Sequence, residues 1–356
     1  MLRRIGVKGL IVALSLGLLW LTFGDVRVAD VERLFAGAGL FWLGLPVPFL
    51  LAQLLDASAY QLLLQRLGLR VPFRRTLMAQ VAGESATLAL PMGFLVGESV
   101  RPWLLSIGQP ETLPKSVAGA TGRKLLLVFS EGFWIFATLL FAVNSVAALS
   151  QRRFGSAGLI WLSMGVAAAL MIAATVLALS LCRSQFASAL FTGLTRVLPA
   201  RLARAVAQRQ ATFARTDDEL HRILSLKPSA WARPACHYIG VWLLEGLEAY
   251  LILRLLGASV DLATVLYVEA LVATLRALVP IAPAGLGIQD AGYAAFFAWI
   301  GVPAAPDMAA AFCLTKRTRE LVFCLFGGAC LVTARRWARS RAPSVTRFAL
   351  GAEPGE

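Results

Sequence analysis

The sequence predicts an all-α polytopic membrane protein, with about six full spans and two broken-helix (re-entrant) hairpins arranged as an inverted repeat. Hydrophobic residues make up 58% of the chain and the mean hydropathy is +0.72, more apolar surface than a soluble domain of this size buries. Several apolar runs approach the ~20 residues that a helix needs to cross a bilayer. Two further apolar segments are interrupted by proline, glycine and charged residues.

The chain begins with residues 1–38, which hold the first predicted span, at about 5–24, and an outer linker. Basic residues precede the apolar run, but the run is long and no small-residue cleavage site closes it. We therefore expect a retained span and not a cleaved signal peptide. The second span, at about 39–64, opens a first repeat in the membrane, 39–182.

The first repeat continues with a broken segment at about 76–106, a long helix at about 114–146 and a returning span at about 157–181. Pro91 and Gly93 interrupt the broken segment. Backbone groups freed by such a break are costly in hydrocarbon unless protein or water receives them. We therefore expect the segment to turn back near Pro91 and to line a polar interior.

Residues 183–229 form a basic loop that we place in the cytoplasm. Its Ala- and Arg-rich sequence suits an interfacial helix on anionic lipid as well as it suits a solvated connector. A second repeat in the membrane, 230–334, follows with a span at about 235–256, a second broken segment and a last span at about 309–333. A basic tail, 335–356, is assigned to the cytoplasm.

The second broken segment repeats the features of the first in the same order. The helix before each break ends in an acidic and aromatic stretch and then a glycine, each break holds a Pro-x-Gly motif, and an acid and an arginine follow. The matched residues are Gly68 and Gly257, Pro91 and Pro283, Gly93 and Gly285, Glu98 and Asp290, and Arg123 and Arg317. This order favours two copies of one unit. Copies inserted from opposite faces are typical of secondary transporters with a site near the membrane midplane.

Lysine and arginine are unevenly distributed between the loops. The four pieces assigned to the cytoplasm hold three, four, eight and five of them, twenty in all, and the outside pieces hold Arg27, Arg33, Arg152 and Arg153. By the positive-inside rule this bias predicts that both termini lie in the cytoplasm. The net charge of +14 then reflects topology and anionic lipid, and we expect no nucleic acid partner.

Acidic residues inside apolar helices are candidate functional residues, because charges at that depth are costly and mark ion or substrate pathways. Asp56, Glu245 and Glu248 stand in such helices. In one interpretation they carry protons or accept a lipid headgroup. In the other they pair with arginines and only fix the packing. The arginines considered as partners are Arg123, Arg276 and Arg317.

The two breaks supply further candidates. Helix ends there can present backbone amides to an anionic group, small residues let a ligand approach closely, and nearby cations hold a lipid phosphate or neutralise the hairpin acids. The candidate lipid-path residues are Asp56, Glu98, Arg123, Glu245, Glu248, Arg276, Gly285, Gly287, Gln289, Asp290, Lys316, Arg317, Arg319 and Glu320. No cofactor motif, metal site or pair of nucleophile and base stands out, so we expect no enzyme.

Two stretches carry a resemblance to a known family. They are LVPIAPAGLGIQDAGYAAFF with LTKRTREL in the second repeat, and LPMGFLVGESVRPWLL with Gly122-Arg123-Lys124 in the first. Over about residues 10–335 the chain resembles the flippase-like family that contains the transmembrane region of lysylphosphatidylglycerol synthase, and within it the hopanoid-biosynthesis-associated membrane proteins. The resemblance implies an inner-membrane protein that handles a lipid. Asp290 departs from the family's usual glutamate and keeps the carboxylate on a shorter arm.

The expected function is a lipid transporter or flippase of the bacterial cytoplasmic membrane, acting on a hopanoid or an anionic phospholipid. The alternative is a membrane scaffold that gathers lipid-biosynthesis enzymes through its basic loop and transports nothing. Many hopanoid headgroups lack phosphate, which leaves Arg123 and Arg317 only the hairpin acids as partners. Bifunctional members of the family add a soluble aminoacyl-transfer domain after the membrane region. Only a short tail follows the last predicted span here, so we expect no lysyl transfer.

Overall fold

A computed structural model provides the structure. It describes residues 44–90, 93–197, 210–279 and 285–340, together with Gly17, Thr22, Ala29 and 31–33. All regular elements in these ranges are helices and none is a strand, which confirms the predicted all-α class. Most of the predicted first span, the prolines Pro91 and Pro283 of the two breaks, residues 198–209 of the basic loop and the tail beyond Ser340 lie outside the described residues.

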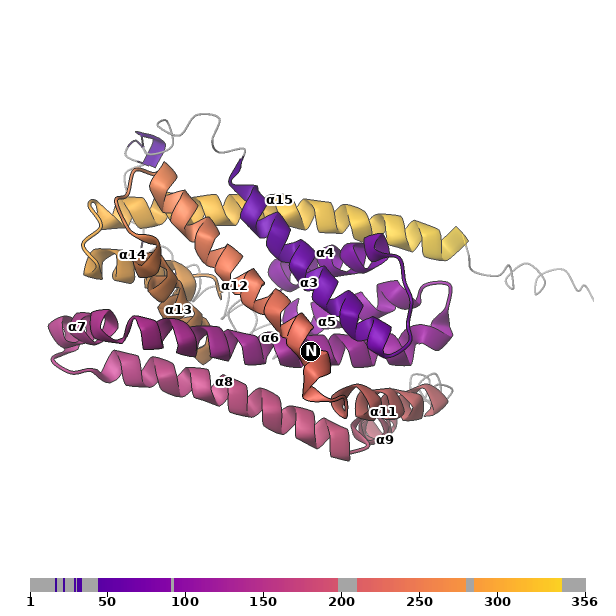
Figure 1. The fold of residues 1–356 in the computed structure, drawn as a ribbon. Coiled ribbons are helices and arrows are strands. Elements are labelled where there is room, and N and C mark those ends of the chain that lie inside the picture. The colour runs from indigo at the N-terminus through magenta and orange to yellow at the C-terminus, as the bar shows by residue number, and fades with distance from the viewer. Residues whose placement is uncertain are drawn as a thin grey trace, which may run out of the picture.

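Twelve α-helices form the described bundle (Figure 1). They are α3 (Pro46–Arg66), α4 (Phe73–Ala89), α5 (Gly93–Ser106), α6 (Leu113–Phe141), α7 (Val143–Phe154), α8 (Gly158–Arg183), α9 (Phe186–Val197), α11 (Gln210–Leu224), α12 (Pro228–Leu255), α13 (Leu262–Leu278), α14 (Ile288–Trp299) and α15 (Ala305–Ser340). A short 3-10 turn, Pro110–Thr112, leads directly into α6.

Four segments are long and apolar enough to cross a membrane, and they match four of the predicted spans: α3, α8, α12, and α6 with its leading turn. The predicted last span lies within α15, which has 36 residues. Large apolar side chains face outward on these helices, with Trp161 71% and Leu325 69% exposed. Such a surface suits lipid and not water, and the chain is a multi-pass membrane protein.

The helices α3 and α12 open the two repeats and end in the same way. Each begins at a proline, which suits the first turn because the missing N–H has no helical partner there. Each ends at a glycine with positive φ, Gly68 at +71° and Gly257 at +85°. The next amide then donates back into the last turn, from Leu69 to the carbonyl of Leu64 and at the equivalent place in α12. The glycine match found in the sequence is therefore a structural equivalence.

Both broken segments are helical hairpins. In the first, α4 ends at Ala89 and α5 begins at Gly93. The two helices pack closely because a side chain at Gly97 would overlap the carbonyl oxygen of Gly83. In the second, α13 ends at Leu278 and α14 begins at Ile288, so the break is longer.

The two hairpins lie at opposite ends of the bundle (Figure 1). The helices α3 and α12 contact each other and run in opposite directions, with α4–α5 beside the C-terminal end of α3 and α13–α14 beside that of α12. The long helix after each hairpin packs on the first helix of the other one, α6 on α13 and α15 on α4. This exchange is the arrangement expected of an inverted repeat.

The largest apolar core joins α6 to the second repeat. Trp134 of α6 stacks on Trp242 of α12 with ring centroids 5.9 Å apart, and the Trp242 indole N–H donates to Ser130 at 3.3 Å. The long helix of the first repeat is thus built into the core of the second.

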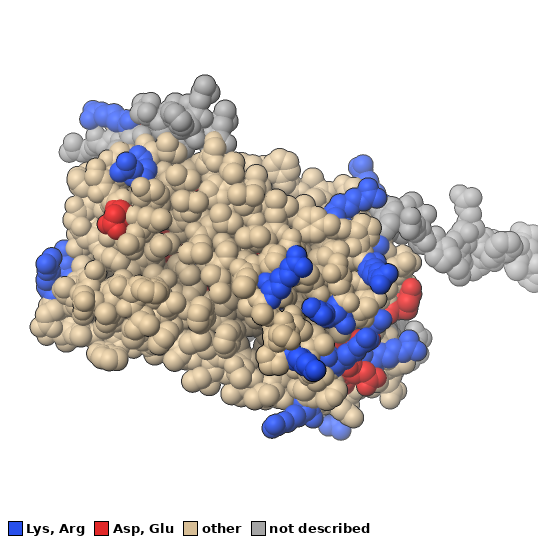
Figure 2. Space-filling view, viewed as in Figure 1, with Lys and Arg blue, Asp and Glu red and all other residues tan. Residues whose placement is uncertain are grey.

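The described part of the basic loop is folded, and it is more than a solvated connector. The helices α9 and α11 pack on each other, and α11 also packs on α6 and α8, burying Leu220 and Ile223. The carboxylate of Asp217 accepts bonds from the first amides of α9, at 2.7 Å from Ala187. In the face shown in Figure 2, most Lys and Arg side chains lie at this end and the middle of the bundle carries almost none.

Candidate functional site

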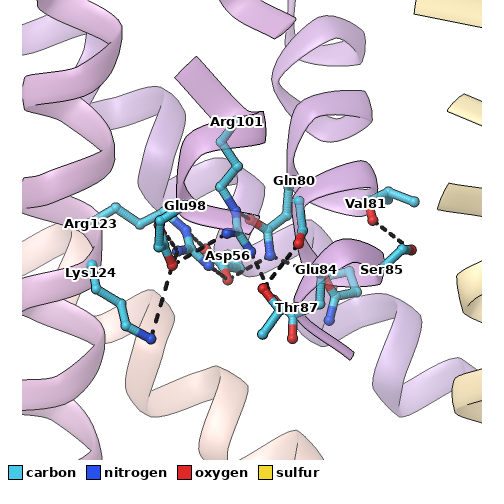
Figure 3. A network of polar contacts seen from close by, with 12 residues as sticks. Asp56, Gln80, Val81, Glu84, Ser85, Thr87, Glu98, Arg101, Arg123 and Lys124 are labelled. Atoms are coloured by element: carbon cyan, nitrogen blue, oxygen red, sulfur yellow. Dashed lines mark hydrogen bonds and ion pairs between the residues drawn. The ribbon is translucent and has the colours of Figure 1, made fainter. Parts of the chain in front are cut away.

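A first charge cluster lies between α3, α4, α5 and α6 (Figure 3). Its charged members are Asp56, Glu84, Glu98, Arg101, Arg123 and, at the longer distance of 4.0 Å from Glu98, Lys124. The buried guanidinium of Arg123 donates from Nη2 and Nε to the two oxygens of Asp56, at 2.5 and 2.8 Å, and from Nη1 to Glu98 at 3.1 Å. A two-pronged arginine–carboxylate contact of this kind is among the strongest polar contacts that proteins make.

Arg101 of α5 is also fully buried in this cluster. It donates to the carboxylate of Glu84 at 2.8 Å and to the side-chain oxygen of Gln80 at 2.8 Å. Gly83 faces its side chain, and a Cβ there would collide with it. The glycine therefore makes the space in which the arginine lies against α4.

The second repeat contributes one hydrogen bond to the first cluster. The hydroxyl of Tyr238, on α12, donates to Asp56 at 3.0 Å, and Gln80 donates to the same carboxylate at 2.8 Å. Together with Arg123, these donors satisfy a carboxylate that burial would otherwise make costly. Asp56 therefore makes the arginine pair that one of the two interpretations of the sequence expected.

A second charge cluster lies between α12, α13, α14 and α15. Its charged members are Glu248, Glu269, Asp290, Lys316, Arg317, Arg319 and Glu320. Arg317 lies 2.9 Å from Asp290 and 2.8 Å from Glu320. The carboxylate of Asp290 also accepts the backbone N–H of Gly287 at 2.9 Å and so caps the first turn of α14.

The same ion pair therefore stands after both breaks. Glu98 pairs with Arg123 in the first repeat, and Asp290 pairs with Arg317 in the second. In each case the acid lies on the second helix of the hairpin and the arginine lies on the long helix that follows. The sequence match between the two copies extends to a contact between side chains.

Two further pairs complete the second cluster. The ammonium of Lys316 lies 3.0 Å from Glu269 and 2.7 Å from the hydroxyl of Tyr293, which itself donates to Glu269 at 2.8 Å. Arg319 lies 2.5 Å from Glu248 and 3.9 Å over the ring of Phe49. The partner of Glu248 is thus Arg319 and none of the three arginines considered from the sequence.

Three charged residues make no close ion pair with either cluster and are held much less tightly; we call Glu131, Glu245 and Arg276 the central charges. Arg276, at the end of α13, reaches Glu131 of α6 only at 4.0 Å, and its Nε is buried without a partner. Its side chain is 31% exposed and that of Glu131 is 20% exposed. Among the described residues, no hydrogen bond or ion pair involves the carboxylate of Glu245.

The second break frames Arg276. Gly285 has φ +67° and Gly287 has φ +82°, conformations that only glycine adopts at low cost. A Cβ at Gly285 would lie 3.0 Å from Gln289 Oε1 and 3.5 Å from Arg276 Cδ, so the bare backbone lets both side chains approach the break. Two sequence-predicted residues of the second repeat, Arg276 and Gln289, thus lie beside this turn.

Several residues of the site were missed from the sequence. They are Gln80, Glu84, Glu131, Tyr238, Glu269 and Tyr293. Glu84, Glu131 and Glu269 carry the same signal as the predicted acids, a carboxylate within an apolar helix. They could have been found by applying that rule to every helix and not only to those next to the matched motifs.

An apolar helical bundle, two broken hairpins at opposite ends and charges paired in its interior define an integral membrane protein built on an inverted repeat. Residues 8–338 match the family model described as lysylphosphatidylglycerol synthase TM region. The chain belongs to this family, which is associated with membrane lipid metabolism or transport. No curated protein and no solved structure matches the chain. The resemblance to the family is confirmed, and the likeness to its hopanoid-associated members stays a prediction.

Proposed function

We propose that the chain is a lipid transporter of the bacterial cytoplasmic membrane, with both termini in the cytoplasm, that passes a lipid headgroup between the two leaflets. The observation that carries this proposal is the pair of equivalent ion pairs, Glu98–Arg123 and Asp290–Arg317, after two hairpins at opposite ends of the bundle. An inverted pair of this kind has two related conformations, one open to each side.

The pairing of the arginines supports a hopanoid-type lipid over an anionic phospholipid. Asp56 and Glu98 already neutralise Arg123, and Asp290 and Glu320 contact Arg317. A phosphate would have to displace these carboxylates, whereas a neutral polar headgroup would not. In this proposal the chain is a transporter and not an enzyme.

Lipid exchange by the purified protein tests the proposal. Vesicles that contain the full chain and a labelled lipid should equilibrate the label between leaflets, faster for a hopanoid than for phosphatidylglycerol. Asp290→Ala and Arg317→Ala should abolish the exchange in protein that remains folded. Arg196→Ala, on the exposed surface of α9, is the matched control and should exchange normally. Vesicles that show no exchange of any lipid would refute the transporter.

A second candidate is a scaffold that gathers lipid-biosynthesis enzymes. It is favoured by the folded α9–α11 region, which carries a polar surface pocket of about 280 Å³ beside Arg183, Asp217 and His221. Such a protein would retain enzymes through this region without moving lipid. Enzymes that co-purify with the wild type and are lost when the pocket residues are replaced, in protein without lipid exchange, would favour the scaffold.

A further inference from the structure

One ion pair joins the charges of the two repeats. Among the ion pairs between described residues, every other pair lies within one repeat or within the basic loop. The exception is Glu131 of α6 with Arg276 of α13. Its separation of 4.0 Å equals the longest found, so the link between the repeats is among the weakest contacts of the network.

Glu245 of α12 lies one turn after Trp242, whose indole N–H donates at 3.3 Å to Ser130, the residue before Glu131. The charged groups that act on its carboxylate are Arg276 and Glu269 from α13 and Lys316 and Arg319 from α15. The two cations of α15 already hold other carboxylates at 3.0 and 2.5 Å. Glu245 therefore has no cation of its own, and it competes with Glu131 for Arg276.

The surroundings of Glu131 do not supply a second cation at close range. Apart from Arg276, the basic group that acts on it is Lys124, two turns earlier on α6, and Lys124 also lies 4.0 Å from Glu98. The helix α8 packs along α6 and has no charged residue from Gly158 to Cys182. Two carboxylates thus face one guanidinium in the interior.

We propose that Glu131 and Glu245 share one bound proton around Arg276, and that this proton is the coupling ion of the transporter. A second carboxylate without a cation is costly in an apolar bundle. A proton on the acid that is not paired with Arg276 removes that cost. Both Glu131 and Arg276 are partly exposed, so the pair is not sealed inside the bundle. The coupling role rests on the proposed function, but the proton site does not.

The shared proton makes Arg276 a switch between the repeats. With the proton on Glu245, Arg276 pairs with Glu131 and ties α13 to α6 across the repeat boundary. With the proton on Glu131, Arg276 pairs with Glu245 inside the second repeat and the tie is released. Alternating access requires contacts between the repeats to form and break in this way.

Infrared difference spectroscopy on the purified full chain in lipid vesicles tests the proton site without relying on transport. The wild type should show the carbonyl band of one protonated carboxylic acid at pH 7, lost as the pH is raised. Glu245→Gln and Glu131→Gln should each lose the band, because one carboxylate then faces one guanidinium. Glu111→Gln, an exposed acid in the turn before α6, should keep it.

The outcomes separate the two proposals. A wild type without the band at pH 7, or a band that survives in both single variants, overturns the shared proton. A wild type with the band and no lipid exchange refutes the transporter and leaves the proton site standing. A wild type that exchanges lipid at a rate unaffected by a pH gradient overturns the coupling role.

Discussion

The two hairpins are copies of one unit, yet they hold their charges very differently. In the first, Arg101 and Arg123 contact carboxylates at 2.5 to 3.3 Å and are fully buried. In the second, Arg276 stands at the end of the first helix, 31% exposed, and reaches a carboxylate only at 4.0 Å. The first hairpin is therefore an anchor, and the second combines an anchored pair at Arg317 with a loosely held group.

The backbones of the two hairpins differ in the same way. Gly83 and Gly97 bring α4 and α5 into close contact beside Arg101, so the first hairpin has no room for a ligand between its helices. The second hairpin has a longer break with two glycines at positive φ. In a protein built from two copies of one unit, one copy can thus stabilise the fold while the other stays available for binding. The variants below test this difference between the two hairpins.

The largest effect is expected for Arg123→Ala. It leaves the buried carboxylate of Asp56 without a cation and removes one of the cations that contact Glu98, and breaking a buried pair in this way costs about 3–5 kcal/mol. The purified variant should have a much lower Tm in detergent, or should fail to accumulate. Neutralising the acids as well, with Asp56→Asn and Glu98→Gln, should recover part of the loss. A single variant as stable as the wild type would contradict the anchor role.

The next effect is expected for Gly97→Leu. A side chain there would overlap the carbonyl oxygen of Gly83 and the hydroxyl of Thr87, and overpacking of this kind costs about 1–3 kcal/mol. The matched control is Gly165→Leu on α8, where a Cβ meets nothing within 4 Å. Thermal unfolding in detergent should separate the two variants clearly. Equal Tm values would mean that the first hairpin is not closely packed.

The breaks, and the residues that follow them, could be predicted because their signals are local. Proline and glycine close together in an apolar run predict an interruption, and α4 ends at Ala89 and α5 begins at Gly93. A glycine in the left-handed conformation ends a helix through local hydrogen bonds, which is why Gly68 and Gly257 mark equivalent positions. The match between the copies singled out Glu98 and Arg123, and contact with the hairpin acids was one of the two roles considered for the cations.

The remaining contacts depend on how the long helices cross, and the sequence does not contain that information directly. Three arginines were considered as partners of Glu248, but it pairs with Arg319 instead. The position along α12 at which α15 contacts it selects the partner. Tyr238 reaches Asp56 from the other repeat. Glu131 has no counterpart among the matched residues of the second repeat, and only its contact with Arg276 identifies it as part of the site.

A small effect on stability with a large effect on transport is expected for Arg276→Gln. A partly exposed pair at 4.0 Å contributes at most about 1 kcal/mol, so the Tm should fall only slightly. Lipid exchange in vesicles should be lost, because the charge that alternates between the repeats is gone. A large fall in Tm together with normal lipid exchange would mean that Arg276 stabilises the fold and has no part in transport.

The smallest effect is expected for Arg222→Ala in α11. Its side chain is 56% exposed and its partner Glu219 lies 3.7 Å away on the same helix, and exposed pairs of this kind contribute about 0.5 kcal/mol or less. Both the Tm and lipid exchange should stay at the wild-type values. A loss of lipid exchange comparable with that of Arg276→Gln would mean that removing any arginine is sufficient to stop exchange. The difference between the central charges and the rest of the molecule would then have no functional meaning.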